Sequence, residues 1–155
     1  MDDTSLRLAN KSDVQLIFNW ANDDLVRENS LHKDKIKWDN HIIWFRNKLL
    51  SNETFIFILE EGSSSIGQIR FDKEKDYYTV DYSVDKHYRG KGFGQKILIK
   101  SLIKIREIED YDITIKAIVL KSNISSQKVF QKVGFTEDIN LGNDLFIHFQ
   151  LKTTN

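Results

Sequence analysis

The stretch Tyr88-Arg89-Gly90-Lys91-Gly92-Phe93-Gly94 joins a predicted strand to a predicted helix. Alternating residues 78–84 precede it, and a helical pattern with one apolar side follows it. Its glycines lack a β-carbon, so the backbone can curl tightly and point several N–H groups at one anion. Arg89, Lys91 and the helix N-terminus add positive charge. The stretch therefore suits a diphosphate, although a glycine-rich turn taken alone is as often a packing feature.

A second informative stretch is Asn123-Ile124-Ser125-Ser126, which runs on to Phe130 and Gly134-Phe135. We interpret it as a second wall beside the phosphate loop. The commoner phosphate motifs do not fit the first stretch, because it has no Gly-Lys-Ser/Thr ending, and its glycines fall at relative positions one, three and five. A dinucleotide fingerprint requires positions one, three and six.

Hydrophobic periodicity predicts an α+β fold. Three consecutive strands argue against a doubly wound parallel sheet and favour a mixed one. Strands are expected near residues 6–8, 54–60, 65–72, 77–84, 112–120, 135–138 and 144–151. Helices are expected near 13–21, 39–50, 93–109 and 125–133, with a polar connection over 22–37.

Two details of the early helices follow from local patterns. Ser12 is expected to cap the first helix, because its hydroxyl can accept a hydrogen bond from a free backbone N–H. In the second helix, the spacing predicts one buried face made of Trp38, Ile42, Phe45 and Leu49.

Composition predicts one domain spanning residues 1–155, since 155 residues with 40% hydrophobic content can form a proper core. Lys plus Arg and Asp plus Glu number 23 each, which argues against nucleic-acid or membrane partners. No cysteine is present, which excludes disulfides and an acyl-cysteine intermediate. The dispersed histidines predict no metal site. The polar start and the short apolar runs indicate no export signal or membrane span, so a cytoplasmic location is expected.

The two stretches carry a family resemblance. Arg89-x-x-Gly92-x-Gly94 after a strand resembles the coenzyme A pyrophosphate loop of the GNAT acetyltransferase superfamily, and Asn123 and Gly134-Phe135 fall where that family's second motif places its helix. The resemblance implies a largely antiparallel mixed sheet flanked by helices and splayed between the fourth and fifth strands. It also implies acetyl-CoA as co-substrate. The coenzyme-binding residues it implies are Val84, Arg89, Gly90, Lys91, Gly92, Phe93, Gly94, Asn123, Ser126 and Phe130.

The N-terminal part is similar to the acetyltransferases of bacterial pseudaminic-acid synthesis. The residues that carry this resemblance are Trp20-x-Asn22-Asp23, Arg27-x-Asn29-Ser30, Trp38, His41, Trp44-Phe45 and Gly67-Gln68-Ile69-Arg70-Phe71-Asp72. It implies an N-acetyltransferase acting by direct transfer on the amine of a nucleotide-linked amino sugar, such as a UDP-amino sugar. Acetylation of a protein N-terminus, as in ribosomal-protein acetyltransferases, or of a small amine is the alternative. A non-catalytic coenzyme-binding or regulatory module is a third, and a homodimer is a possible assembly.

Candidate catalytic groups are few. The resemblance implies that a backbone N–H around Val84 faces the thioester oxygen. Many members of the family have a tyrosine as general acid where this chain has Phe130, so water or the Ser126 hydroxyl is left to protonate the thiolate. Asp81, Tyr78 and Asp76 are candidates for the base, because they lie on or next to the strand that would carry it. A solvated strand carboxylate is the alternative interpretation of Asp81. His32 and His41 are further candidates, and a partly exposed structural role is as plausible for His41.

Acceptor recognition is expected from two polar segments. Arg27, Asn29, Ser30 and His32 lie in a connection long enough to bind a ligand. Gln68 and Arg70 share one strand face, where Arg70 could pair with a nucleotide phosphate or with Asp81. An ordinary salt bridge across the sheet explains Arg70 as well.

Overall fold

A sheet with the strand order β1-β2-β3-β4-β5-β7-β6 runs through the structure. It is seen in a computed structural model of the chain, which describes residues 1–154. The strands are β1 (Thr4–Leu8), β2 (Thr54–Glu61), β3 (Ser64–Lys73), β4 (Tyr78–Val84), β5 (Ile113–Leu120), β6 (Thr136–Glu137) and β7 (Phe146–Thr153). Each lies within a few residues of the segment predicted from periodicity.

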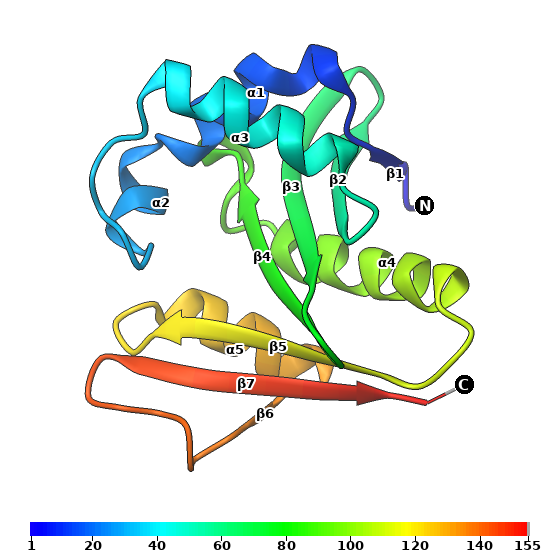
Figure 1. The fold of residues 1–155 in the computed structure, drawn as a ribbon, viewed down its shortest axis with the longest axis vertical. Coiled ribbons are helices and arrows are strands. Elements are labelled where there is room, and N and C mark those ends of the chain that lie inside the picture. Colours follow the sequence, from blue (N-terminus) through cyan, green and yellow to red (C-terminus); the bar gives the residue numbers. More distant parts are fainter. Residues whose placement is uncertain (155) are drawn as a thin grey trace.

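The sheet parts between β4 and β5. All other neighbouring strands are antiparallel, whereas β4 and β5 are parallel and pair only at Tyr78 with Ile115 and at Thr79 with Lys116. From this shared corner β4 rises and β5 runs sideways (Figure 1). The expected splay between the fourth and fifth strands is therefore confirmed. We call the wedge between the two strands the slot.

Helices cover both faces of the sheet. Their bounds are α1 (Val14–Ala21), α2 (Asp24–Glu28), α3 (Trp38–Leu50), α4 (Phe93–Ile108) and α5 (Ile124–Val133). Residues of β2 alternate between the two faces. Phe57 and Leu59 pack with residues of α4, whereas Ile56 and Ile58 pack with residues of α1 and α3. Helix α5 packs beside α4.

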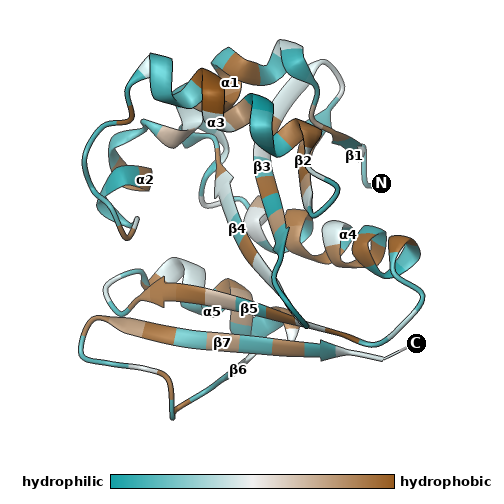
Figure 2. Cartoon of the chain, viewed as in Figure 1, coloured by the Kyte–Doolittle hydropathy of each residue, from teal (hydrophilic) through white to brown (hydrophobic). Residues whose placement is uncertain are grey.

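The hydrophobic residues follow this layering. In Figure 2 hydrophobic colour is concentrated along β5 and β7, while the segment that joins α2 to α3 is mostly hydrophilic. Fully burying one side chain such as Ile69 or Phe71 contributes about 1.5–3 kcal/mol, and both have no exposed surface. Within residues 1–154, no helix has the length and apolar character needed to cross a membrane.

The N-terminal helices differ from the prediction in two ways. The segment predicted as a polar connection contains α2, which Asp23 caps by accepting hydrogen bonds from the N–H groups of Leu25 and Val26. The first helix is preceded by a 3-10 turn, Lys11–Asp13, whose cap is Asn10 and not Ser12. Helix α2 is too short for a hydrophobic repeat to be recognised among its polar residues.

The buried face of α3 is also different from the predicted one. Phe45 is buried, but Trp38 and Ile42 are 37% and 39% exposed. His41 takes the inner position instead, at 2% exposed, and its Nε2 lies 2.8 Å from the carbonyl oxygen of Val14. That hydrogen bond gives the buried Nε2 of His41 a partner. A polar residue can therefore occupy the core position that was predicted for an apolar one.

Candidate active site

The loop between β4 and α4 forms a cradle of free backbone amides. Gly90 and Gly92 have φ angles of +76° and +84°, in the left-handed region that side chains disfavour. Within the described residues, no hydrogen bond is donated by the N–H groups of Lys91–Gln95. They lie at the N-terminus of α4, where the helix dipole is positive. The loop therefore keeps the donors that a diphosphate requires.

The edge of β4 that faces the slot carries backbone groups directed away from β3. The N–H of Asp85 donates to the carbonyl of Ile66 at 2.8 Å, in register with the β3–β4 pairing. Alternate residues of an antiparallel strand bond to the same neighbour, so Val80, Tyr82 and Val84 direct their N–H and C=O groups toward β5. β5 reaches β4 only at the first two residues of β4. The N–H of Val84 therefore points into the slot, as do those of Tyr82 and Val80.

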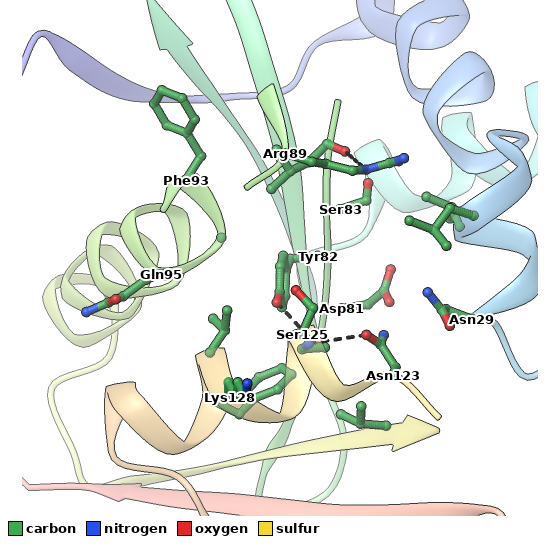
Figure 3. A pocket seen from close by; sticks show the side chains of 18 of the residues that line it. Asn29, Asp81, Tyr82, Ser83, Arg89, Phe93, Gln95, Asn123, Ser125 and Lys128 are labelled. Atoms are coloured by element: carbon green, nitrogen blue, oxygen red, sulfur yellow. Dashed lines mark hydrogen bonds between the residues drawn. The ribbon is translucent and has the colours of Figure 1, made fainter. Parts of the chain in front are cut away.

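A cavity of about 540 Å³, here called the coenzyme cavity, lies between the loop, the slot and α5. All the predicted coenzyme residues except Lys91 line it (Figure 3). Asn123 caps α5, because its Oδ1 accepts a hydrogen bond of 3.2 Å from the N–H of Ser126. A β-carbon on Gly94 would lie 3.2 Å from Cε2 of Tyr82, so glycine lets α4 begin close against β4.

The two predicted phosphate-binding cations are placed differently. Arg89 lies at the cavity, where its Nε donates to the carbonyl of Val84 at 3.0 Å and its Nη2 pairs with Asp23 at 2.7 Å. Burial alone would raise the pKa of Asp23, but Arg89 and backbone hydrogen bonds lower it overall. Lys91 lies outside the lining, and its ammonium is 5.9 Å from the Tyr88 ring centre. Arg89 thus ties the phosphate loop to α2.

A second cavity, of about 780 Å³, lies on the face of the sheet covered by α1–α3. We call it the acceptor cavity, because every residue proposed for the acceptor lines it: Arg27, Asn29, Ser30, His32, Gln68 and Arg70. Residues of the opposite wall were missed in the sequence, notably Lys116 on β5 and His148 on β7. Alternation along β5 places Lys116 and Ile118 on one face. This signal could have identified Lys116.

The two cavities meet at the slot. Val80, Asp81, Ser83 and Ile118 line both of them, together with residues of the α2 segment. Asp81 is exposed there, and its side chain makes no ion pair or hydrogen bond within the described residues. Figure 3 shows it next to Tyr82, with Asn29 across the cavity. A ligand in each cavity could therefore meet beside one free carboxylate.

The sequence of residues 4–136 matches the acetyltransferase (GNAT) domain family. The chain belongs to the GNAT acetyltransferase family. Its activity class is therefore acyl transfer. No curated protein matches the sequence significantly.

Solved GNAT structures resemble the fold. A spermidine N-acetyltransferase from Vibrio cholerae, solved with CoA and spermine, superposes with a TM-score of 0.87 at 15% identity, over 97% of this chain and 95% of that one. The yncA protein of Salmonella typhimurium, solved with its cofactor acetyl-CoA, gives 0.77 at 21% identity, over 99% and 96%. A ribosomal L7/L12 α-N-protein acetyltransferase in complex with coenzyme A gives 0.81 at 12% identity, over 97% and 94%.

Phe130 of this GNAT chain packs in the core. It is 3% exposed, and its ring centre lies 4.9 Å from that of Phe135, 5.8 Å from Phe149 and 5.6 Å from Tyr82. Tyr82, in turn, donates a hydrogen bond of 3.3 Å from its hydroxyl to Oγ of Ser126. Tyr82 shares one face of β4 with Val80 and Val84, and all three line the coenzyme cavity.

Arg70 pairs with Asp72 and not with Asp81. Its Nε lies 2.7 Å from Oδ2 of Asp72, which Lys48 also approaches at 2.7 Å. Burial would raise the pKa of Asp72, but the two cations lower it overall. The Arg70 guanidinium also lies 5.2 Å from the Trp44 ring centre. Its side chain thus combines a salt bridge with a position on the acceptor cavity.

Of the other residues predicted to bind the acceptor, Arg27 lies in α2 and Gln68 on β3, and the segment between α2 and α3 contains Asn29, Ser30 and His32. Arg27 donates from Nε to the carbonyl of Ala21, from Nη1 to those of His32 and Asp34, and from Nη2 to Oγ of Ser30. It therefore holds this segment of the GNAT domain in place. His41, whose pKa burial lowers, is packed among aromatic rings at the edge of the acceptor cavity.

Proposed function

We propose that this protein is an acetyl-CoA-dependent N-acetyltransferase whose acceptor is the amine of a nucleotide-linked amino sugar. Acetyl-CoA fits the chain's own residues: the free amides at Gly92 and Gly94 suit its diphosphate, and the edge of β4 at Val84 suits its amide-containing arm. The bound coenzyme supplies an activated acetyl group. The chain binds it, orients it and removes a proton from the amine.

The charge of the acceptor cavity is the observation that carries the acceptor class. Lys116 makes no ion pair within residues 1–154, and its ammonium lies 4.2 Å from the Tyr77 ring centre. Arg70 uses its Nε for Asp72, while its terminal nitrogens have no hydrogen bond there. Asp72 is neutralised by its two cations, which leaves Asp81 as the free acid. Such a cavity suits an acceptor that combines one amine with anionic phosphates.

Asp81 is the proposed base. The amine nitrogen attacks the thioester carbon only when neutral, and a carboxylate between the cavities can take its proton directly or through one water. The N–H of Val84 is the proposed donor to the thioester oxygen, with Tyr82 and Val80 offering equivalent groups along the same edge. Both substrates are held together, so direct transfer needs no enzyme-bound acetyl group.

An acceptor panel tests the proposal. Release of free thiol from acetyl-CoA is measured with UDP-4-amino sugars, spermidine and peptide N-termini, and mass analysis identifies each acetylated product. We expect the amino sugars to exceed the background without acceptor and to exceed the other amines. Preference for spermidine would favour the small-amine alternative, to which the likeness to spermidine N-acetyltransferases lends support. Coenzyme binding without any transfer would favour a non-catalytic module.

Removal of the Lys116 charge should weaken acceptor binding selectively. One hydrogen bond to a charged group contributes about 1.5–3 kcal/mol, so Lys116→Ala is expected to raise the KM for the amino sugar about tenfold to 100-fold. The KM for acetyl-CoA should stay unchanged. Lys75→Ala, in the exposed turn between β3 and β4, is the matched control. Equal acceptor KM values for both variants would contradict the assigned phosphate contact.

A further inference from the structure

Two consecutive residues of β4 face different cavities. Asp81 lies where the cavities join, whereas Tyr82 lines the coenzyme cavity and not the acceptor cavity. Alternation along a strand explains this, because neighbouring side chains point to opposite faces. The carboxylate is thus available to the amine, and the phenol is available on the side from which the coenzyme arm enters.

Acetyl transfer moves one proton on each of these two sides. As the new C–N bond forms and the C–S bond breaks, the amine loses a proton and the sulfur departs as a thiolate. A thiol has a pKa of roughly 8.5, so near neutral pH the thiolate takes up a proton from an adjacent donor. Asp81 serves the amine, and the thiolate needs another group.

Hydroxyl groups of the coenzyme cavity differ in position. Tyr88 lies at the phosphate loop, with its ring centre 5.9 Å from that of Phe93. Ser125 is exposed at the start of α5. Tyr82 and Ser126 are joined to each other at 3.3 Å and connect β4 to α5 across the inner part of the cavity. Phe130 and Gly94 enclose the Tyr82 ring, which fixes its direction.

We infer that the Tyr82–Ser126 hydroxyl pair returns the proton to the departing thiolate. This inference rests on the acetyl transfer proposed above. The sulfur takes the proton of the Ser126 hydroxyl, and Ser126 takes the proton of Tyr82 in the same step. Tyr82 then recovers a proton from solvent. Asp81 releases to solvent the proton that it took from the amine. Ser126 contacts the sulfur, and Tyr82 acts through Ser126 as a positioning and proton-supplying residue.

The electrostatics of Tyr82 keep its phenol protonated. Burial raises the pKa of its phenol, and the hydrogen bond to Ser126 only partly opposes that effect. Tyr82 therefore keeps its proton at neutral pH, so the proton is present when the thiolate forms, although the raised pKa by itself makes the phenol a weaker acid. A phenol with an ordinary or lowered pKa would lose this proton more readily at alkaline pH.

The test compares two acetyl donors. With acetyl-CoA, Tyr82→Phe and Ser126→Ala are each expected to lower kcat about tenfold. This is less than the roughly 100- to 10,000-fold of a typical general acid, because a thiolate is a mild base. With acetyl-seleno-coenzyme A, whose selenol is far more acidic, the selenolate needs no proton and the defect should shrink to about twofold. Tyr111→Phe, at an exposed tyrosine outside both cavities, is the control.

Three results separate the possible outcomes. An equal loss with both donors would mean that Tyr82 only packs, and would overturn the inference. Wild-type kcat in Tyr82→Phe would overturn it as well. Transfer to amines other than amino sugars, with the donor-dependent defect intact, would overturn only the proposed acceptor. Calorimetric titration with coenzyme A verifies that each variant still folds and binds.

Discussion

Gly92→Val is expected to abolish binding of coenzyme A. Gly92 has a φ of +84° and caps α4, and the N–H groups on either side of it are the free donors of the phosphate loop. A β-branched side chain cannot hold this backbone conformation without strain, so the donors would turn away from the phosphates. Loss of two hydrogen bonds to a charged group, at about 1.5–3 kcal/mol each, should raise the Kd at least about 100-fold by calorimetry.

Gly62→Val is the matched control for this prediction. Gly62 lies in the hairpin between β2 and β3 with a φ of +60°, and a β-carbon there would meet nothing within 4 Å. It therefore carries similar backbone strain far from the loop. Both variants should lose comparable thermal stability, and only Gly92→Val should lose coenzyme binding. An unchanged Kd in Gly92→Val would place the phosphates elsewhere.

Asp81→Asn is expected to lower kcat by about 100- to 10,000-fold, the range of a general base. Asparagine has the same shape but cannot accept the proton of the amine. Because the Asp81 side chain makes no ion pair or hydrogen bond within the described residues, the substitution removes neither kind of contact. The Kd of coenzyme A should therefore remain within about twofold of wild type. Initial rates at saturating acetyl-CoA and acceptor measure the effect.

Asp76→Asn controls for the loss of one negative charge nearby. Asp76 lies in the exposed turn that leads into β4 and does not line either cavity. It should leave kcat unchanged. If Asp81→Asn also retained wild-type kcat, the carboxylate would be only a solvated residue of the strand, and the base would have to be sought among water or the histidines of the acceptor cavity.

The strands and long helices could be predicted because their signals are local. Alternation marked β2 to β5, and the apolar side of α4 marked its full length. Helix α2 was missed because its stability comes from the cap at Asp23 and from the Arg27 contacts that hold the following segment. On α3, the outward position of Ile42 depends on the hydrogen bond that His41 makes with another helix. Periodicity alone contains no information on such a partner.

The candidate site divides in the same way. Glycine spacing predicted the loop that carries the free amides, and polar residues on β3 predicted one wall of the proposed acceptor cavity. Lys116 and His148 were missed because they reach the cavity only through the divergence of β5 and β7 from β4. The contact of Tyr82 with Ser126 could not be predicted, because it depends on how α5 packs. The direction of Arg89 likewise depends on Asp23, distant in sequence.

The parted sheet makes the coenzyme a structural component as well as a reactant. Backbone groups of β4 that a neighbouring strand would normally satisfy are left for a ligand, and in the proposed complex the coenzyme arm substitutes for this missing stretch of strand. A ligand that binds only the folded chain stabilises it by about 2.7 kcal/mol at 100 times its Kd. Saturation with coenzyme A is therefore expected to slow unfolding and proteolysis of this chain.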